Sequence, residues 1–194
     1  TLYIAEARAL RGMFYFELVR RFGNVVLMTS TQMSNQNPAT YVQSAPEKVY
    51  EYIEDDLLYA CDILPYATDD QYRESNDYRF SKGAALGLLT KVYATWAGYP
   101  VKDESKWEAA AKTARILVES GKHGLLKDYE QLWKNTCNGT WDPTESLIEI
   151  SFYSPTVSGN SDPVGRIGKW NGVKTTAIAG VRGSCAANVK VVHT

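Results

Sequence analysis

The sequence predicts a mainly α-helical domain built from antiparallel helix hairpins, followed by an irregular, partly β C-terminal segment. Three observations support this fold class. Four segments between residues 2 and 121 carry apolar side chains at the i, i+3/i+4 spacing of an amphipathic helix. A glycine or a proline ends each segment. A pattern of small residues in the first segment recurs later in the chain.

The first helix is expected over residues 2–22. Its apolar side chains recur every three or four positions and predict a buried stripe on one face. The members of this stripe are Ala7, Leu10, Phe14, Leu18 and Phe22. Gly23 ends the helix, residues 25–29 read as a short extended run, and the polar residues 30–40 are expected to form a loop.

The second helix is expected over residues 45–64. Ser44 can cap it, Pro46 suits its first turn, and Glu47 stands at the capping-box spacing. Its apolar stripe comprises Val49, Ile53, Leu57, Ala60 and Leu64. Pro65 stops the helix, and a polar, Tyr-rich loop is expected to follow.

Two further helices are expected over residues 81–97 and 105–120. Ser81 and Ser105 are placed to cap them, and Glu108 stands at the capping-box position behind Ser105. The apolar stripe of the third helix comprises Ala84, Leu88, Val92 and Trp96.

The four helices are expected to pair as two hairpins, residues 2–64 and 81–121. Small residues recur between the hairpins at a constant offset. Ala9, Gly12 and Gly23 of the first correspond to Ala84, Gly87 and Gly98 of the second. Small side chains let two helices approach closely, as in tetratricopeptide repeats, whose ideal period of about 34 residues is lengthened here by insertions. The sequence therefore predicts tetratricopeptide-like helix hairpins, an α-α superhelix, over residues 1–126.

The pattern changes after residue 126. Residues 129–133 can form one short helix, and residues 147–153 alternate in polarity like a strand. Beyond them the chain is rich in Gly, Ser, Asn and Val without a helical period. We expect residues 127–194 to form an irregular segment with short strands, and to contain the candidate ligand-contact region.

The composition excludes several classes of protein. A net charge of -1 over 194 residues gives no field that would attract nucleic acid. Three scattered cysteines and two histidines cannot assemble a zinc cluster of ordinary spacing. No stretch approaches the ~20 apolar residues that cross a bilayer.

No catalytic motif stands out in the sequence, so an enzyme is not expected, and neither is a cofactor or a bound metal. The chain has no G-x-S-x-G elbow, no P-loop and no H-E-x-x-H pair. Asp55 and Asp56 are adjacent on a predicted helix and therefore point to different faces. We expect both to lie on a solvated helix surface rather than to act as a glycosidase pair.

The aromatic residues fall into two groups. Phe14, Tyr93 and Trp96 lie on apolar helix stripes and are expected in the core. A second group lies late in the chain among polar residues and comprises Trp141, Tyr153 and Trp170. Sugar C–H faces pack on such rings, and polar neighbours such as Asn171 and Asp142 can bind the hydroxyls.

If the chain binds a sugar, the contact is expected through Trp170 with Asn171, helped by Trp141 or Tyr153. The alternative is that these aromatic side chains only cap the helical core. Both interpretations stay open at the level of sequence.

Three stretches together resemble the SusD/RagB family of outer-membrane nutrient-uptake lipoproteins. The first is AEARALRGMFYFELVRRFG at residues 5–23, followed by the apolar residues 25–27. The second is RFSKGAALGLLTKVY at residues 79–93. The third begins with WEAAAKTA at residue 107 and ends with ESLIEISF at residue 152.

This resemblance implies a tetratricopeptide-like helical core and a lipid-anchored position at the cell outer membrane. It also implies that the protein captures an oligosaccharide and passes it to a TonB-dependent, SusC-like transporter. Family members are longer, so we expect the lipid anchor to lie outside this chain, and any glycan site completed by those further segments to be partial or missing within it. Two other hypotheses stand beside this one: a tetratricopeptide-type protein-interaction scaffold without sugar binding, and a hydrolase with dispersed carboxylates.

Overall fold

The computed structural model describes residues 1–150 apart from 31–34, 36, 70–78 and 139. The described residues form five α-helices and one short 3-10 helix. Their bounds are α1 Leu2–Phe22, η2 Pro38–Thr40, α2 Pro46–Ile63, α3 Lys82–Ala97, α4 Lys106–Glu119 and α5 Tyr129–Asn138. None of the helices searched in this part of the chain is long and apolar enough to span a membrane. The predicted mainly helical fold is confirmed.

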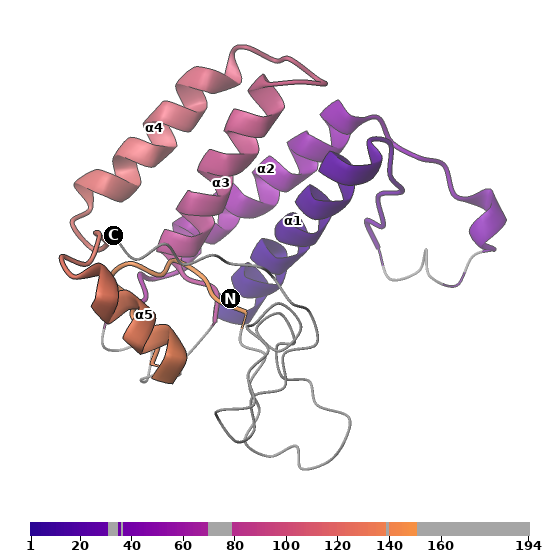
Figure 1. Cartoon of the computed structure of the whole chain (residues 1–194). Coiled ribbons are helices and arrows are strands. Elements are labelled where there is room, and N and C mark those ends of the chain that lie inside the picture. Colours follow the sequence, from indigo (N-terminus) through magenta and orange to yellow (C-terminus); the bar gives the residue numbers. More distant parts are fainter. Residues whose placement is uncertain (31–34, 36, 70–78, 139, 151–194) are drawn as a thin grey trace, which may run out of the picture. The chain divides into compact units, whose positions relative to one another are not determined.

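Helices α1 to α4 lie side by side in one array (Figure 1). Contacts between α1 and α2 show that the two helices are antiparallel. Tyr15 contacts Tyr52 edge to face, with ring centroids 5.8 Å apart, and the guanidinium of Arg8 lies 4.3 Å from the ring centroid of Tyr59. Residue numbers on α2 therefore rise as those on α1 fall, as in a hairpin.

Helices α3 and α4 follow α2 in the same side-by-side arrangement. Tyr50 of α2 stacks on Trp96 of α3 with ring centroids 5.3 Å apart, and the ammonium of Lys106 on α4 lies 3.9 Å from a ring centroid of Trp96. Helices α2 and α3 thus have a helix on each side. Helices α1 and α4 form the two edges of the described array (Figure 1).

Small residues on α1 set the close approach of the first hairpin. Ala5 and Ala9 are fully buried, and a Cβ at Gly12 would lie 3.3 Å from Cγ of Leu57 on α2. The expectation that small residues mark the inner face holds here. Tyr93 and Trp96 are also buried, as expected.

The predicted buried stripe of α1 is wrong. Leu10, Phe14, Leu18 and Phe22 are 40%, 59%, 40% and 70% exposed, and Phe14 is therefore not a core residue. The buried face of the helix instead comprises Ala5, Glu6, Ala9, Gly12, Tyr15, Phe16 and Val19. Both sides of α1 are apolar, and the side with the smaller residues packs on α2 because it lets the two backbones come close.

The capping predictions have mixed outcomes. Ser81 caps α3 as expected, because its hydroxyl accepts a 3.2 Å hydrogen bond from the amide of Ala84. Ser44 does not cap α2, which begins after Ala45. Its backbone instead pairs with Val25 through bonds of 2.8 and 3.3 Å. Ser105 begins α4 without a capping bond, since its hydroxyl donates to the carboxylate of Asp103 at 2.5 Å.

After α4 in the chain comes α5, which extends beyond the predicted residues 129–133 to Asn138. Residues 147–150, predicted as the start of a strand, are not in a strand. The rest of the expected β segment lies outside the described residues and stays a prediction. The domain boundary expected at residue 126 also stays a prediction. Residues 1–149 form one compact unit.

Candidate functional site

Of the four residues expected to bind a glycan, the structure describes only Trp141. Its side chain is 8% exposed and therefore buried. The neighbouring Asp142 accepts a 2.8 Å hydrogen bond from the amide of Thr144 and thereby shapes a local turn. Tyr153, Trp170 and Asn171 lie outside the described residues, so the predicted site stays a prediction.

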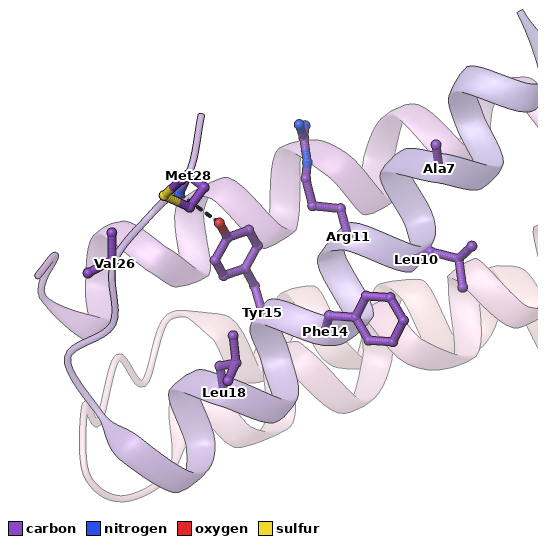
Figure 2. Close-up of a pocket in the computed structure, with 8 residues that line it drawn as sticks. All are labelled: Ala7, Leu10, Arg11, Phe14, Tyr15, Leu18, Val26 and Met28. Carbon is purple, nitrogen blue, oxygen red and sulfur yellow. Dashed lines mark hydrogen bonds between the residues drawn. The ribbon is translucent and has the colours of Figure 1, made fainter. Parts of the chain in front are cut away.

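A groove along the outer side of α1 is a candidate binding surface that sequence reasoning missed. Its cavity volume is about 560 Å³. It is lined by Ala7, Leu10, Arg11, Phe14, Tyr15, Leu18, Val26 and Met28 (Figure 2). We call this surface the α1 groove. Six of its eight side chains are aliphatic, thioether or phenyl groups, so it favours an apolar ligand.

The extended residues 25–28 form the second wall of the α1 groove. Val25 and Leu27 are each 8% exposed and enter the core, whereas Val26 and Met28 line the groove. This alternation is what an extended backbone produces. The hydroxyl of Tyr15 fixes the wall to α1 by accepting a 2.7 Å hydrogen bond from the amide of Met28 (Figure 2).

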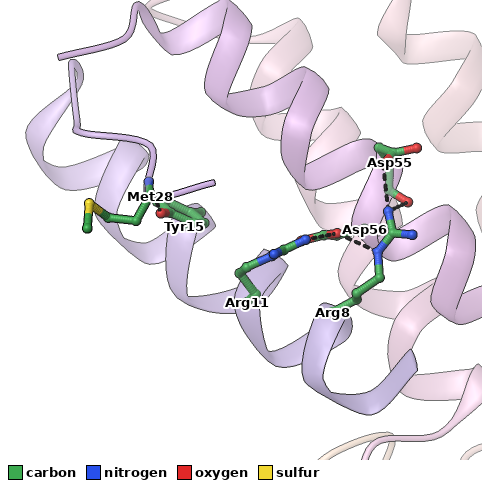
Figure 3. Close-up of polar contacts among 6 residues, drawn as sticks. All are labelled: Arg8, Arg11, Tyr15, Met28, Asp55 and Asp56. Atoms are coloured by element: carbon green, nitrogen blue, oxygen red, sulfur yellow. Dashed lines mark hydrogen bonds and ion pairs between the residues drawn. The ribbon is translucent and has the colours of Figure 1, made fainter. Parts of the chain in front are cut away.

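An ionic cluster joins α1 to α2 beside the α1 groove (Figure 3). Asp56 is fully buried. Its carboxylate accepts hydrogen bonds of 2.7 and 2.8 Å from Arg11 and one of 2.7 Å from Arg8. Arg8 also donates to the exposed carboxylate of Asp55 at 2.6 Å. The prediction of a solvated surface is therefore wrong for Asp56 and holds for Asp55.

The electrostatics of the α1 groove follow from this cluster. Hydrogen bonding to Asp56 raises the pKa of the Arg11 guanidinium above its usual value, and burial opposes this shift only in part. The same guanidinium lies 4.8 Å from the ring centroid of Tyr52. Because Asp56 already neutralises Arg11, this arginine is poorly placed to attract an anionic ligand.

A second candidate surface lies on α5. Tyr129 and Trp133 are 70% and 54% exposed, and their rings meet edge to face with centroids 6.2 Å apart. The i, i+4 spacing of the two aromatic residues was a signal in the sequence that could have identified this pair. Exposed rings of this kind can pack on the C–H face of a sugar.

Nothing in the described residues points to a metal or thiol chemistry. No group of three or more His, Cys, Asp or Glu side chains that could hold a metal ion occurs in that part of the chain. Burial raises the pKa of the Cys61 thiol to about 12. This thiol is therefore protonated and a poor nucleophile at neutral pH.

Comparison with known proteins identifies the family. Residues 3–94 match a SusD-like family model described as starch-binding and associating with the outer membrane. A SusD-like protein of Bacteroides ovatus is 29% identical to this chain. The aligned region covers 88% of this chain and 32% of the relative.

Two solved structures share the fold. A laminarin-binding SusD-like protein is 33% identical with a TM-score of 0.57, covering 76% of this chain and 30% of the other. A structure with a xylogluco-oligosaccharide is 32% identical with a TM-score of 0.62, covering 77% and 29%. The chain thus spans about a third of the length of these relatives. Together with the family model over residues 3–94, they confirm the resemblance seen in the sequence, that of a fragment of a SusD-like protein.

Proposed function

We propose that this chain is part of a glycan-binding protein of outer-membrane nutrient uptake. In this role the protein captures an oligosaccharide at the cell surface and passes it to a TonB-dependent, SusC-like transporter. The observation that carries the proposal is the similarity, at 32% and 33% identity, to a structure with a xylogluco-oligosaccharide and to a laminarin-binding protein. The role is one of binding, without catalysis.

Trp170 and Asn171 are the residues that we propose as the main glycan contacts. An indole ring offers a flat apolar face for a sugar, and the neighbouring amide can both donate to and accept from hydroxyl groups. Trp141 is buried within the described part of the chain, so its ring is not available there to stack on a sugar. A stacking ring contributes on the order of 1 kcal/mol beyond area burial, so several contacts must cooperate.

Polar contacts between its helices make the helical array rigid. The buried Asp56 links α1 to α2, and the 2.7 Å hydrogen bond from the Tyr93 hydroxyl to Glu54 links α3 to α2. Loops on a rigid scaffold are common carriers of binding residues. The exposed pair of Tyr129 and Trp133 adds aromatic surface within the same chain.

The test is a titration of the chain with defined oligosaccharides from laminarin, xyloglucan and starch, followed by tryptophan fluorescence and calorimetry. Saturable binding of one glycan class supports the proposal. A glucose-free sugar alcohol of similar size serves as the control for nonspecific effects. Absence of saturable binding to every glycan, both by this chain and by the full-length protein, would contradict it.

The α1 groove favours one alternative, a scaffold that binds a protein segment and no sugar. Its lining is largely apolar, whereas sugar recognition needs polar groups for the hydroxyls. Saturable binding of a glycan would rule this alternative out.

A further inference from the structure

Two stretches of chain on either side of α5, residues 122–126 and 140–148, are bonded to each other. The amide of Gly124 donates a 2.9 Å hydrogen bond to the carbonyl of Thr144, and the amide of Leu126 donates one of 2.6 Å to the carboxylate of Glu145. We call the two stretches together the strap. Its residue Ile148 packs against the core of the helical array, so the strap is docked on the array.

Two glycines of α3 make room for the strap. Gly83 and Gly87 are four residues apart and therefore lie on the same side of the helix. A Cβ at Gly87 would lie 2.6 Å from Cδ1 of Leu147, and a Cβ at Gly83 would clash with the imidazole of His123. The strap thus meets α3 through one side chain from each of its stretches, Leu147 and His123.

The hydrogen bonds of His123 fix its tautomer. Its Nδ1 donates a 2.9 Å hydrogen bond to the carbonyl of Pro143, which can only accept. Its Nε2 is buried next to Gly83 and has no hydrogen-bond partner among the described residues. In the neutral ring Nε2 carries no hydrogen and needs no acceptor. A protonated ring would have an N–H there, which requires an acceptor.

The surroundings on the α3 side also disfavour a positive charge on His123. Gly83 is the second residue of α3, and the first turn of a helix carries a partial positive charge. The ring of Tyr66 lies 5.8 Å from that of His123, between centroids. The ammonium of Lys82 lies 5.7 Å from the centroid of the same Tyr66 ring. An imidazolium would therefore be placed among positive charges.

The negative groups of the strap and its neighbours already have other partners. The last carbonyls of α4 accept hydrogen bonds from Ser120 and Gly121. The carboxylates are those of Asp69, Asp142 and Glu145, which accept from the Lys122 ammonium at 2.7 Å, the Thr144 amide at 2.8 Å and the Leu126 amide at 2.6 Å. None of these bonds is to the imidazole.

We propose that His123 is a pH-sensitive switch whose neutral imidazole seats the strap on α3 and whose protonation, below about pH 6.5, releases it. The docked strap excludes the proton, whereas a released histidine binds it, so acidification favours release. For a released imidazole that titrates at about pH 6.5, linkage lowers the docking constant about tenfold between pH 7.5 and 5.5.

Hydrogen–deuterium exchange of the full-length protein at pH 7.5 and 5.5 tests the proposal, with rates corrected for the intrinsic effect of pH. We expect the protection of strap peptides to fall about tenfold at pH 5.5. Peptides from residues 49–60 of α2 should keep theirs. His123→Asn should abolish the fall, because its side-chain amide can still donate to the Pro143 carbonyl but takes up no proton.

Lys122→Met is the matched control. It removes the neighbouring ion pair with Asp69 and leaves His123 in place. The hydrogen bond from Lys122 holds the pKa of Asp69 below its usual value, so this pair does not titrate between pH 7.5 and 5.5. We expect Lys122→Met to loosen the strap slightly at both pH values and to keep the tenfold ratio between them.

Three results would overturn the proposal. The first is equal protection of the strap at the two pH values in the unmodified protein. The second is a tenfold fall that persists in His123→Asn, because another group would then be responsible. The third is an equal loss of protection in the α2 peptides, which would show that acid opens the whole array rather than the strap.

Discussion

The carboxylate of Asp56 on α2 accepts two hydrogen bonds from the guanidinium of Arg11 on α1, at 2.7 and 2.8 Å. The contact is bidentate, and Arg8 adds a third bond at 2.7 Å (Figure 3). Bidentate pairing fixes orientation as well as distance. The two helices of the first hairpin are thereby held in one register, next to the α1 groove.

We predict that Asp56→Asn destabilises the fold by about 3 kcal/mol, because one partner of a buried ionic cluster is lost. Urea unfolding followed by circular dichroism measures this change. Asp55→Asn is the matched control: the side chain of Asp55 is 78% exposed, and its pair with Arg8 should contribute less than about 1 kcal/mol. Equal effects of the two substitutions would contradict a structural role specific to Asp56.

Gly83 is predicted to tolerate no larger residue while His123 is present. A Cβ at this position would clash with the imidazole of His123. That ring is held in place because its Nδ1 donates a 2.9 Å hydrogen bond to the carbonyl of Pro143. We expect Gly83→Ala to lower the melting temperature, and His123→Ala to relieve most of this loss in the double variant. A double-mutant cycle measures the coupling, and additive effects would show that the two residues do not conflict.

Cys61 is predicted to resist thiol reagents at pH 8 in the folded protein. Burial raises its pKa to about 12, so the reactive thiolate is scarce. Peptide mass spectrometry after labelling should show modification of Cys61 only when urea unfolds the chain. The raised pKa also predicts how the stability of the fold depends on pH. The neutral Cys61 thiol contributes its full stabilisation below the unfolded-state pKa of about 8.5, and this stabilisation is lost as the pH rises toward 12. Rapid labelling of the native protein would contradict this prediction.

Trp170→Ala is predicted to weaken glycan binding while leaving far-UV circular dichroism and the melting temperature nearly unchanged. The loss of one stacking ring should cost on the order of 1 kcal/mol, about fivefold in affinity. Trp107→Ala, which removes a tryptophan that is 53% exposed on α4, is the matched control. If Trp170→Ala unfolds the domain, the residue belongs to the core. If it changes neither folding nor affinity in the full-length protein, the glycan site lies elsewhere.

The transporter partnership is predicted to be detectable in the native outer membrane. Pull-down of the full-length protein after mild solubilisation should recover a TonB-dependent transporter in a stoichiometric amount. An unrelated lipoprotein of the same membrane, purified in parallel, controls for nonspecific capture. Recovery of cytoplasmic proteins alone would count against the proposed role in uptake.

The sequence determined the positions of the helices because their signals are local. The hydroxyl of Ser81 meets an amide three residues ahead, and Gly23 and Gly121 adopt the positive φ that favours glycine near helix ends. Such interactions involve neighbouring residues and need no tertiary partner. The family resemblance could also be recognised from the sequence, because it depends on the order and spacing of these segments.

Only the tertiary structure decided which side of α1 is buried and what becomes of Asp56. Both sides of α1 are apolar, so periodicity alone could not select between them. Packing selected the side of Ala9 and Gly12 because the absence of bulky side chains there lets α2 approach. The burial of Asp56 depends on Arg8 and Arg11, which are far from it in sequence. A buried charge is stable only beside its partner, and the antiparallel packing of two helices brings that partner into place.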